Sequence, residues 1–429
     1  MQHDFSRRIA TWSVWLLFAF ACQLHGQGPL TPLWIFGDAS NDGGTIYSAP
    51  IFDTAGNIYG TASLGGTHGF GMVFKLTPTT SGLWKETVLY NFKGGLDDGA
   101  TPHATLFRDS AGNLYGTTFT GGLSSSKCGL LTPLPGCGIV FKLTPTTQGE
   151  WKETILHKFA GPEGGNSLTS LAPDKAGNFY GATASGGSKA LGVIFRMSKT
   201  TTGTWVVTVL HNFIGNPDGA NPFIHCMPLV FDSAGNIYGT TEAGGATGNG
   251  IVFKLIPPKI AGGAWTEKIV HTFEGGLNDG MRPMAEVVLD KQGNVFGTTT
   301  GGGTHNQGIA YELSAPNNYA ETILYDFKGI IANDASSPNG LIFDASGNLF
   351  GTSEVGGNGN NGTIFKLTHT STGWEEAVLH NFTPAEGTNS FVPMIFGADG
   401  HLYGSGWVGG DSGSMSSTAG GGSVFEFVP

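Results

Sequence analysis

The chain has 429 residues, of which 71 are glycine, 11% are aromatic and only 12% are charged. This composition favours many short strands joined by glycine turns, and it argues against a helical protein and against disorder. The formal net charge of -11 argues against a nucleic-acid partner and leaves neutral sugars, cations and basic proteins as candidate partners.

Residues 1–26 are predicted to be a secretory signal peptide. Two arginines precede an apolar run that ends in an Ala-x-Ala cleavage motif, and this run is too short to span a bilayer comfortably. Cys22 follows the motif directly, so a lipidated N-terminal cysteine is the alternative, although the residues before it match a lipoprotein signal poorly. We therefore expect residues 27–429 to be secreted or periplasmic and not transmembrane.

One eight-residue signature organises the rest of the chain. It reads Asp-Ser-Ala-Gly-Asn-Ile-Tyr-Gly in its fourth copy, and its seven copies begin at Asp53, Asp109, Asp174, Asp232, Asp290, Asp344 and Asp399. The spacing between successive copies is 54 to 65 residues. A near-constant period of this length indicates one structural unit repeated, so we predict that residues 27–429 form a single domain.

Four strand signals follow one another in the first complete repeat, at residues 49–53, 57–61, 71–76 and 84–92. We call them strands A, B, C and D. Apolar and polar residues alternate in them with a period of two, and no helical periodicity lies between them. Repeats of four strands are typical of β-propeller blades. The sequence therefore predicts an all-β, seven-bladed β-propeller.

The two ends of the chain predict how the ring closes. The last repeat has signals for strands A, B and C, and then the chain stops. Residues 32–37, near the N-terminus, look like the missing strand D, with Phe36 aligned to Phe92. We expect this N-terminal strand to complete the seventh blade and to remove an exposed sheet edge.

The repeats resemble a known family. The motifs Asp-x-x-Gly-Asn-Ile/Leu-Tyr-Gly-Thr, Val-Phe-Lys-Leu-Thr-Pro and Trp-x-Glu-Thr-Val-Leu-x-x-Phe are similar to the GloVer (Gloeo-Verruco type) tandem repeats of exported bacterial proteins. The turn Asp-x-x-Gly-Asn-x-Tyr is also similar to that of NHL-type propellers. The resemblance covers nearly the whole mature chain and implies an exported, propeller-like repeat protein with no particular activity. Members commonly carry a C-terminal surface anchor, and this chain ends at Val428-Pro429 without one.

Two sets of repeated acids invite a metal or catalytic interpretation. The signature aspartates stand at strand ends shortly before a glycine, where a carboxylate accepts turn N–H groups, so we predict a structural role for them. The second set stands in the D-to-A loops, at Asp42, Asp98, Glu163, Asp218, Asp279, Asp334 and Glu386. Such acids are common in turns. The alternative is a ring that binds Ca²⁺, which needs six or more oxygen ligands, so we predict no cofactor and keep Ca²⁺ as the alternative.

Two cysteines bracket a short insertion in the second repeat. In an oxidising compartment, a disulfide between Cys128 and Cys137 is the plain interpretation. A zinc site there would need two further soft ligands, and none lies within sequence reach, so no metal site is predicted. Cys226 is predicted to be a small buried side chain.

The main candidate site residues occupy a position at which the repeats differ, three residues beyond the strand-B glycine. This position holds Ser63, Phe119, Ala184, Glu242, Thr300, Glu354 and Trp407. If it faces the mouth of the central channel, Phe119 and Trp407 flank one side of the mouth, and Glu242 and Glu354 flank the other. Aromatic rings opposite two carboxylates suit a sugar, and carboxylates within about 10 Å of each other could act as a catalytic pair.

Other polar side chains on the same face widen the set of candidates. The histidines in or near its loops are His68, His103, His225 and His305, and their spacing matches no metal motif. Arg282 could neutralise a uronate, and with Tyr311 and Glu286 it could serve a lyase. We therefore predict that His68, His103, His305 and Arg282 bind the ligand together with Phe119 and Trp407.

The sequence favours an exported, monomeric binding module whose loop-rich face binds a glycan or another extracellular polymer. The first alternative is a polysaccharide hydrolase or lyase that uses Glu242 and Glu354. The second is a scaffold for protein contacts in the cell envelope. No motif in the chain decides among these three hypotheses.

Overall fold

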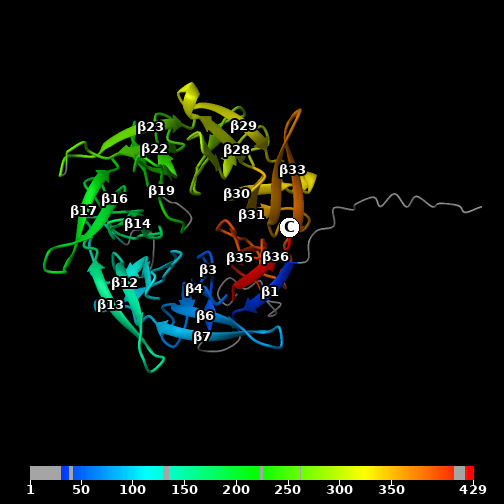
Figure 1. The fold of residues 1–429 in the computed structure, drawn as a ribbon. Coiled ribbons are helices and arrows are strands. Elements are labelled where there is room, and N and C mark those ends of the chain that lie inside the picture. The colour runs from blue at the N-terminus through cyan, green and yellow to red at the C-terminus, as the bar shows by residue number, and fades with distance from the viewer. Residues whose placement is uncertain (1–29, 38–41, 129–134, 223–225, 261, 410–420) are drawn as a thin grey trace, which may run out of the picture.

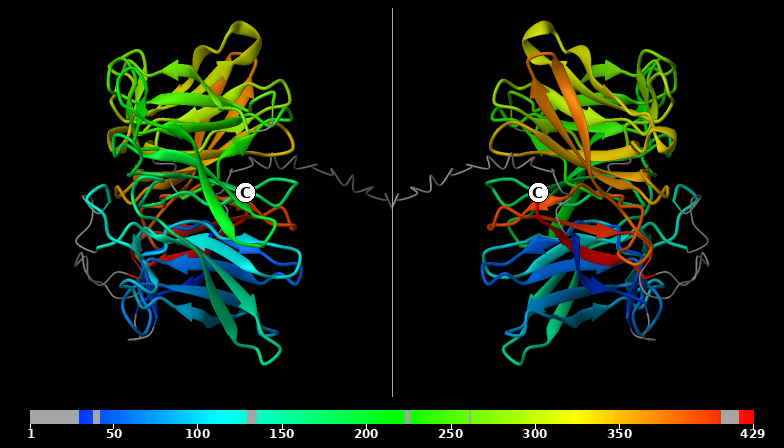
Figure 2. Two further views of the ribbon diagram at one scale, coloured as in Figure 1. Left: turned by 90° about the vertical axis from the view of Figure 1, so that its left-hand side faces the viewer. Right: turned by 90° about the vertical axis from the view of Figure 1, so that its right-hand side faces the viewer.

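Seven four-stranded antiparallel sheets stand in a ring around a central axis (Figure 1), and Figure 2 shows this ring edge-on. The computed structural model describes residues 30–37, 42–128, 135–222, 226–260, 262–409 and 421–429. Within these residues, helical structure is limited to two 3-10 turns, η1 (Ala315–Asn317) and η2 (Ile330–Ala332). The predicted all-β, seven-bladed propeller is confirmed. The predicted signal peptide, including Cys22, lies outside the described residues.

The first six blades have strands A to D in the same order from the axis to the rim. Blade 1 has β3 (Ile51–Phe52), β4 (Ile58–Ala62), β6 (Met72–Pro78) and β7 (Trp84–Asn91). Blade 2 has β9 (Phe107–Arg108), β10 (Leu114–Thr117), β12 (Ile139–Pro145) and β13 (Trp151–Lys158). Blade 3 has β14 (Ala172–Pro173), β15 (Phe179–Thr183), β16 (Val193–Lys199) and β17 (Trp205–Asn212).

The next three blades repeat this pattern. Blade 4 has β19 (Val230–Phe231), β20 (Ile237–Thr241), β22 (Ile251–Ile256) and β23 (Thr266–Thr272). Blade 5 has β25 (Val288–Leu289), β26 (Val295–Thr298), β28 (Ile309–Ser314) and β29 (Ala320–Asp326). Blade 6 has β30 (Ala335–Phe343), β31 (Leu349–Gly356), β32 (Thr363–Thr370) and β33 (Gly373–Asn381).

Blade 7 combines the two ends of the chain, as predicted. It consists of β34 (Ile395–Phe396), β35 (Leu402–Gly406), β36 (Ser423–Phe427) and, as its outer strand, β1 (Leu30–Ile35). Strand β1 pairs antiparallel with β36, and the two lie side by side in Figure 1. The N-terminal strand thus covers an edge of β36 that would otherwise expose unpaired backbone groups.

Aromatic side chains repeat at every interface between blades. The phenylalanine after strand D packs on the strand-C aromatic ring of the next blade, for example Phe92 on Phe141 with ring centroids 5.1 Å apart. Phe36 packs on Phe74 in the same way at 4.8 Å, which supports its alignment with Phe92. Seven buried apolar clusters, one per interface, follow from this repetition and continue around the whole ring.

The strand-B glycine of the signature has a packing reason. A Cβ atom on Gly60 would lie 2.5 Å from Cζ of Phe74, and one on Gly116 would lie 2.6 Å from Cζ of Phe141. The strand-C ring therefore lies directly over the strand-B backbone, and a larger residue would displace it. This close approach explains why glycine follows the tyrosine or phenylalanine of each copy.

The signature aspartate organises the turn between strands A and B. In the first copy the Asp53 carboxylate accepts hydrogen bonds from the N–H groups of Ala55 and Asn57, from the Asn57 amide and from the Tyr59 hydroxyl. Burial alone would raise the pKa of Asp53, but these hydrogen bonds lower it overall. The contacts are those of the predicted structural role.

The seventh copy of the signature differs from the prediction by two residues. The Gly397 N–H donates to the His401 carbonyl oxygen, as the Asp53 N–H does to that of Asn57, so Gly397 occupies the position of the signature aspartate. Asp399 replaces the missing side chain, because its carboxylate accepts hydrogen bonds from the Tyr403 hydroxyl and the His401 N–H. The seventh copy therefore begins at position 397.

Candidate functional site

Short two-stranded ribbons support one face of the ring. In four blades the D-to-A loop pairs with the B-to-C loop, in β2 (Gly43–Gly44) with β5 (Leu64–Gly65), β8 (Gly99–Ala100) with β11 (Thr120–Gly121), β18 (Gly219–Ala220) with β21 (Ala243–Gly244), and β24 (Gly280–Met281) with β27 (Gly301–Gly302). In blade 6, β30 and β31 extend to make the same contact. Blades 3 and 7 make it through single bridges. The predicted loop-rich face is thus a regular platform.

A residue in each D-to-A loop links neighbouring blades on this face. The Thr101 N–H donates to the Phe70 carbonyl oxygen of the preceding blade, and the Arg282 N–H donates likewise to that of Asn249. The residues at this position are Thr45, Thr101, Asn166, Asn221, Arg282, Ser337 and Asn389, and their φ angles lie between 50° and 60°. The left-handed backbone is held at the same position in every blade, so it fixes where the Arg282 side chain leaves the platform.

A segment of blade 4 crosses the central axis below this face. The Cys226 carbonyl oxygen accepts hydrogen bonds from the Thr105 N–H of blade 2 (3.0 Å) and the Ser170 hydroxyl of blade 3 (2.6 Å). Cys226 is buried, as predicted, and packs with Ala49 of blade 1 and Val392 of blade 7. Beyond the segment, toward the A-to-B turns, the inner strands and Met227 line a largely apolar cavity of about 550 Å³.

Five side chains with aromatic rings form a continuous group at the channel mouth. We call Tyr47, His103, Phe119, Phe391 and Trp407 the aromatic cluster. Phe391 lies 5.0 Å from Trp407 and 5.7 Å from Tyr47, Tyr47 lies 4.4 Å from His103, and His103 stacks on Phe119 at 5.2 Å with 7° between the ring planes, all measured between ring centroids. The cluster spans blades 7, 1 and 2. It connects the predicted residues Phe119 and Trp407 through Tyr47 and His103.

The surroundings of the cluster keep its ionisable members neutral. Burial lowers the pKa of His103 to about 3. Burial, then the neighbouring Cys226 thiol and the Glu354 carboxylate, raise the pKa of Tyr47 to about 12. His103 is therefore an uncharged ring near neutral pH and not a cation. Phe119 is buried, whereas Tyr47, His103, Phe391 and Trp407 are half-buried and keep part of their surface accessible.

Charged residues occupy the opposite side of the mouth. We call Glu242 of blade 4, Arg282 of blade 5 and Glu354 of blade 6 the charged group. Nη2 of Arg282 lies 2.8 Å from Oε1 of Glu242. Burial raises the pKa of Glu354, and the Arg282 guanidinium partly opposes that rise. The Glu354 charge therefore reaches Tyr47 of the aromatic cluster, and the Arg282 charge reaches Glu354.

The other predicted residues lie elsewhere. His68 is exposed in a loop of blade 1, and His305 is exposed in a loop of blade 5 with Asp326 at 3.8 Å. Among the described residues, neither histidine contacts a ring of the aromatic cluster. Tyr311 is fully buried between blades 4 and 5, and Glu286 is buried against Gly340. The arrangement therefore does not place Tyr311 beside Arg282 for lyase chemistry. His225 lies outside the described residues.

The predicted disulfide between Cys128 and Cys137 is confirmed. Both sulfur-bearing residues are buried at the interface between blades 2 and 3. The Cys137 carbonyl oxygen accepts the Asn166 N–H, and the Asn166 amide donates to the Phe119 carbonyl oxygen. Two hydrogen bonds of Asn166 thus connect the disulfide to Phe119 of the aromatic cluster.

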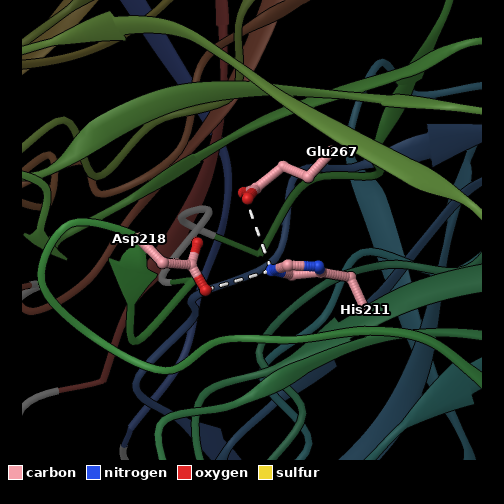
Figure 3. Close-up of side chains that lie close together, drawn as sticks. All are labelled: His211, Asp218 and Glu267. Carbon is pink, nitrogen blue, oxygen red and sulfur yellow. Dashed lines mark hydrogen bonds and ion pairs between the residues drawn. The ribbon is translucent and has the colours of Figure 1, made fainter.

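Among the described residues, three groups of side chains could hold a metal ion, and one of them is drawn in Figure 3. In each group the possible donor atoms lie within 4.8 Å of one another, and the groups are His211, Asp218 and Glu267; His271, Asp279 and Glu321; and Asp399, His401 and Glu426. Figure 3 shows Nε2 of His211 facing both carboxylates, at 3.2 Å from Asp218 and 3.6 Å from Glu267. The first two groups include acids of the predicted D-to-A ring.

Equivalent positions in other blades favour a structural interpretation of these groups. The Tyr90 hydroxyl lies 3.0 Å from an Asp98 oxygen and 2.9 Å from a Glu153 oxygen, in the positions that His211, Asp218 and Glu267 occupy two blades further on. A neutral phenol makes the same bridge as the imidazole, so the bridge does not require a metal. We call this set an inter-blade link: a strand-D histidine or tyrosine, the D-to-A acid and a glutamate from the next blade.

The acids of the inter-blade links vary in a correlated way. Where the D-to-A acid is aspartate, the next blade provides a strand-D glutamate, namely Glu86, Glu153, Glu267, Glu321 or Glu376. Where it is the longer glutamate, at Glu163 and Glu386, the next blade has Val207 or Leu30 instead. Burial, then the nearby aspartate, raises the pKa of Glu153 to about 7 and that of Glu376 to about 8. Their raised pKa values are those expected of acids packed inside the interface next to another carboxylate.

The fold and the mouth define a seven-bladed propeller with a candidate binding face, and comparisons identify its family. Residues 133–268 and 259–429 match the Gloeobacter/Verrucomicrobia repeat. Because the match covers more than half of the chain, the protein belongs to this family, as the motifs predicted. Within the described residues, the chain forms no helix with the length and apolar character of a membrane span.

One solved structure supports the fold at low sequence identity, and a second aligns more weakly. A chain of a mitotic checkpoint complex aligns with a TM-score of 0.50 and 11% identity, over 100% of this chain and 98% of that one. A luciferin-regenerating enzyme aligns with a TM-score of 0.42 and 13% identity, over 76% and 91% of the two chains. No curated protein matches the sequence.

Two residues of the aromatic cluster were missed by the sequence analysis. Tyr47 and Phe391 are absent from the strand-B position that was compared, because they come from the D-to-A segments. Counting six residues back from the signature position gives Tyr47, His103, Leu168, Cys226, Met284, Pro338 and Phe391. This second variable position faces the same mouth, and comparing it across repeats would have found both residues.

Proposed function

We propose that the protein is a carbohydrate-binding module and that its site is the channel mouth. The observation that carries this proposal is the continuity of the aromatic cluster, whose rings run from Trp407 to Phe119 without a gap larger than 5.9 Å between neighbouring ring centroids. Aromatic side chains present large apolar faces on which the C–H faces of a sugar ring can pack. The charged group opposite offers polar partners for hydroxyl groups.

The shape of the site supports an extended ligand. The rings come from three neighbouring blades, and the segment at Cys226 crosses the axis beneath them. A ligand at the mouth therefore lies across the platform, with one part at the aromatic cluster and another at the charged group. An oligosaccharide of a few residues has the length to contact both.

The test is binding of soluble oligosaccharides by isothermal titration calorimetry to Trp407→Ala and to a matched control, Trp374→Ala. Both tryptophans are half-buried, but Trp374 packs at the interface of blades 5 and 6, away from the mouth. We expect Trp407→Ala to weaken binding by roughly tenfold or more, as for loss of about 1.4 kcal/mol or more, and Trp374→Ala to leave affinity unchanged. Equal affinity of both variants and the parent would refute the proposal.

A polysaccharide hydrolase is a second candidate, which one observation favours. Glu242 pairs with Arg282, whereas Glu354 has a raised pKa. Two carboxyl groups in unequal surroundings are what an acid and its partner need in glycoside hydrolysis. We expect Glu242→Gln and Glu354→Gln to abolish any turnover while the melting temperature stays unchanged. Turnover that survives both substitutions would exclude this pair as the catalytic residues.

A further inference from the structure

The charges at the mouth do not balance. The charged group contains two carboxylates and one guanidinium, and Arg282 pairs with Glu242. Among the described residues, no lysine, arginine or histidine lies within ion-pair distance of Glu354. His103 carries no charge near neutral pH because burial holds its pKa at about 3. The charged group therefore has one more acid than it has cations.

Three half-buried rings stand on blades 7 and 1, which follow the blade of Glu354 around the ring. Tyr47, Phe391 and Trp407 have ring centroids 5.0 to 5.9 Å apart in every pairing. Glu354 and Trp407 occupy the same repeat position on neighbouring blades, and the charge of Glu354 acts on the Tyr47 phenol. A carboxylate beside several aromatic faces is the arrangement that binds an ammonium group through ion pairing and cation–π attraction together.

The protein uses the same combination within its own blades. Nζ of Lys254 lies 4.9 Å from the centre of the Tyr238 ring and 3.4 Å from an Asp232 oxygen. Lys75 lies over the Tyr59 ring, Lys142 over Tyr115 and Lys366 over Phe350, at 5.1 to 5.8 Å from the ring centres. In the part of the chain that the structure describes, no ammonium group of the protein lies over Tyr47 or Trp407. The mouth thus provides aromatic rings and an acid, which are the two partners that Lys254 contacts within its blade.

We propose that the mouth selects sugars that carry a protonated amine, with Glu354 pairing with the ammonium group and the rings of Tyr47 and Trp407 covering it. The ligand class is an amino sugar such as glucosamine in a β-linked polymer. This inference rests on the proposed carbohydrate-binding function and adds the charge of the ligand. Arg282 stays paired with Glu242 and excludes a second cation from that side of the mouth.

Three tetrasaccharides with the same β-1,4 backbone test the inference, because they differ only at carbon 2. These are the tetramer of glucosamine with a free amine, the tetramer of N-acetylglucosamine and cellotetraose with a hydroxyl. Binding of each to the mature chain is measured by calorimetry at about pH 6, where most free amines of this kind are protonated and carboxylates are largely ionised. We expect the free-amine tetramer to bind at least tenfold more tightly than the other two.

Two charge-neutralising variants locate the effect. Glu354→Gln should remove the preference for the amine, so that the free-amine tetramer binds this variant no more tightly than cellotetraose does. Glu375→Gln makes the same change of charge at an exposed position of β33 on the same blade, so it should behave as the parent does. If both variants weaken amine binding equally, the preference reflects only attraction of a polycation to an acidic protein, and the inference is wrong.

The outcomes separate the inference from the function on which it rests. Equal binding of the three tetramers, or a preference for the acetylated or neutral one, with loss of binding in Trp407→Ala, would keep the carbohydrate-binding function and overturn the amine specificity. No binding of any tetramer would overturn both. A free-amine preference that Glu354→Gln leaves intact would overturn the role of Glu354.

Discussion

The interfaces between blades and the mouth of the channel are built from equivalent positions of one repeat, yet they vary under different constraints. At the inter-blade links, a longer acid in one blade is matched by loss of the glutamate in the next, as at Glu163 and Val207. At the mouth, Phe119, Glu354 and Trp407 occupy one repeat position with no such compensation. Correlated change therefore marks the scaffold, and uncompensated change marks the candidate site.

The largest loss of stability should come from a change at the interface between blade 7 and blade 1, which closes the ring. Phe36→Ala removes a buried ring that packs on Phe74. We expect it to lower the free energy of unfolding by about 3 to 5 kcal/mol, as for other buried Phe→Ala changes. Urea denaturation followed by tryptophan fluorescence measures this loss. If Phe92→Ala, the matched change inside the ring, costs several kcal/mol and Phe36→Ala costs almost nothing, β1 does not close the ring in solution.

The second effect concerns the disulfide beside the site. Replacing Cys128 and Cys137 by serine removes a cross-link over a sequence separation of 9. We expect a loss of about 2 to 3 kcal/mol in the free energy of unfolding, mostly from the greater freedom of the unfolded chain. Affinity for the ligand should fall as well, because Asn166 joins Cys137 to Phe119. Unchanged affinity in a destabilised double variant would separate the disulfide from the site.

The third effect is a dependence of stability on pH that arises in the inter-blade links. Burial, with a nearby aspartate in each case, raises the pKa of Glu86 and Glu153 to about 7 and that of Glu376 to about 8. Since the folded chain then binds more protons than the unfolded chain above pH 4.5, this contribution is present at low pH and is lost as the pH rises through 7 to 8. The free energy of unfolding should therefore be greater at about pH 5.5 than at about pH 8.

One substitution assigns this pH dependence to the links. Glu376→Gln removes one titrating group, so the fall in stability between the two pH values should become smaller by about 1 kcal/mol or more, as for a shift of one pKa unit or more. The exposed Glu375→Gln should leave the fall unchanged. The lowered pKa values of His103 and His157 act in the opposite direction, and stability that rises with pH would show that they outweigh the glutamates.

The smallest effect on stability is expected at the mouth. Arg282 is 55% exposed, so its ion pair with Glu242 is largely screened by water. Arg282→Ala should change the free energy of unfolding by less than about 1 kcal/mol. Thermal denaturation checks this value, and a loss as large as that of Phe36→Ala would show that the charged group belongs to the scaffold.

The fold could be predicted because all seven repeats must satisfy the same packing requirements. Gly60 and Phe74 have counterparts in every blade, so periodicity shows what packing demands. The site could be predicted only in part. Phe119, Trp407, Glu242 and Glu354 were found at one variable position. Tyr47 and Phe391 stand at a second variable position, six residues before the signature, and the misplaced start of the seventh copy shifts Phe391 out of that register.

The placement of His68 and His305 shows a further limit. Both lie in loops on the predicted face, but a loop has an outer end and an inner end, and these exposed histidines make no contact with the aromatic cluster among the described residues. Asp399 shows how a repeat can be misaligned by two residues when a neighbouring side chain supplies the missing carboxylate. Sequence spacing alone does not distinguish these cases.

The pairing of β1 with β36 has a consequence for how the molecule forms. Strand β1 must wait for β36, which follows all six other blades in the chain, because β36 is the strand of blade 7 with which it pairs. Closing so long a segment costs about 3 kcal/mol more in chain entropy than closing a hairpin of about ten residues, until the intervening blades assemble and bring the two strands together. Six blades can thus stack as an open arc before β1 and β36 pair and lock the circle.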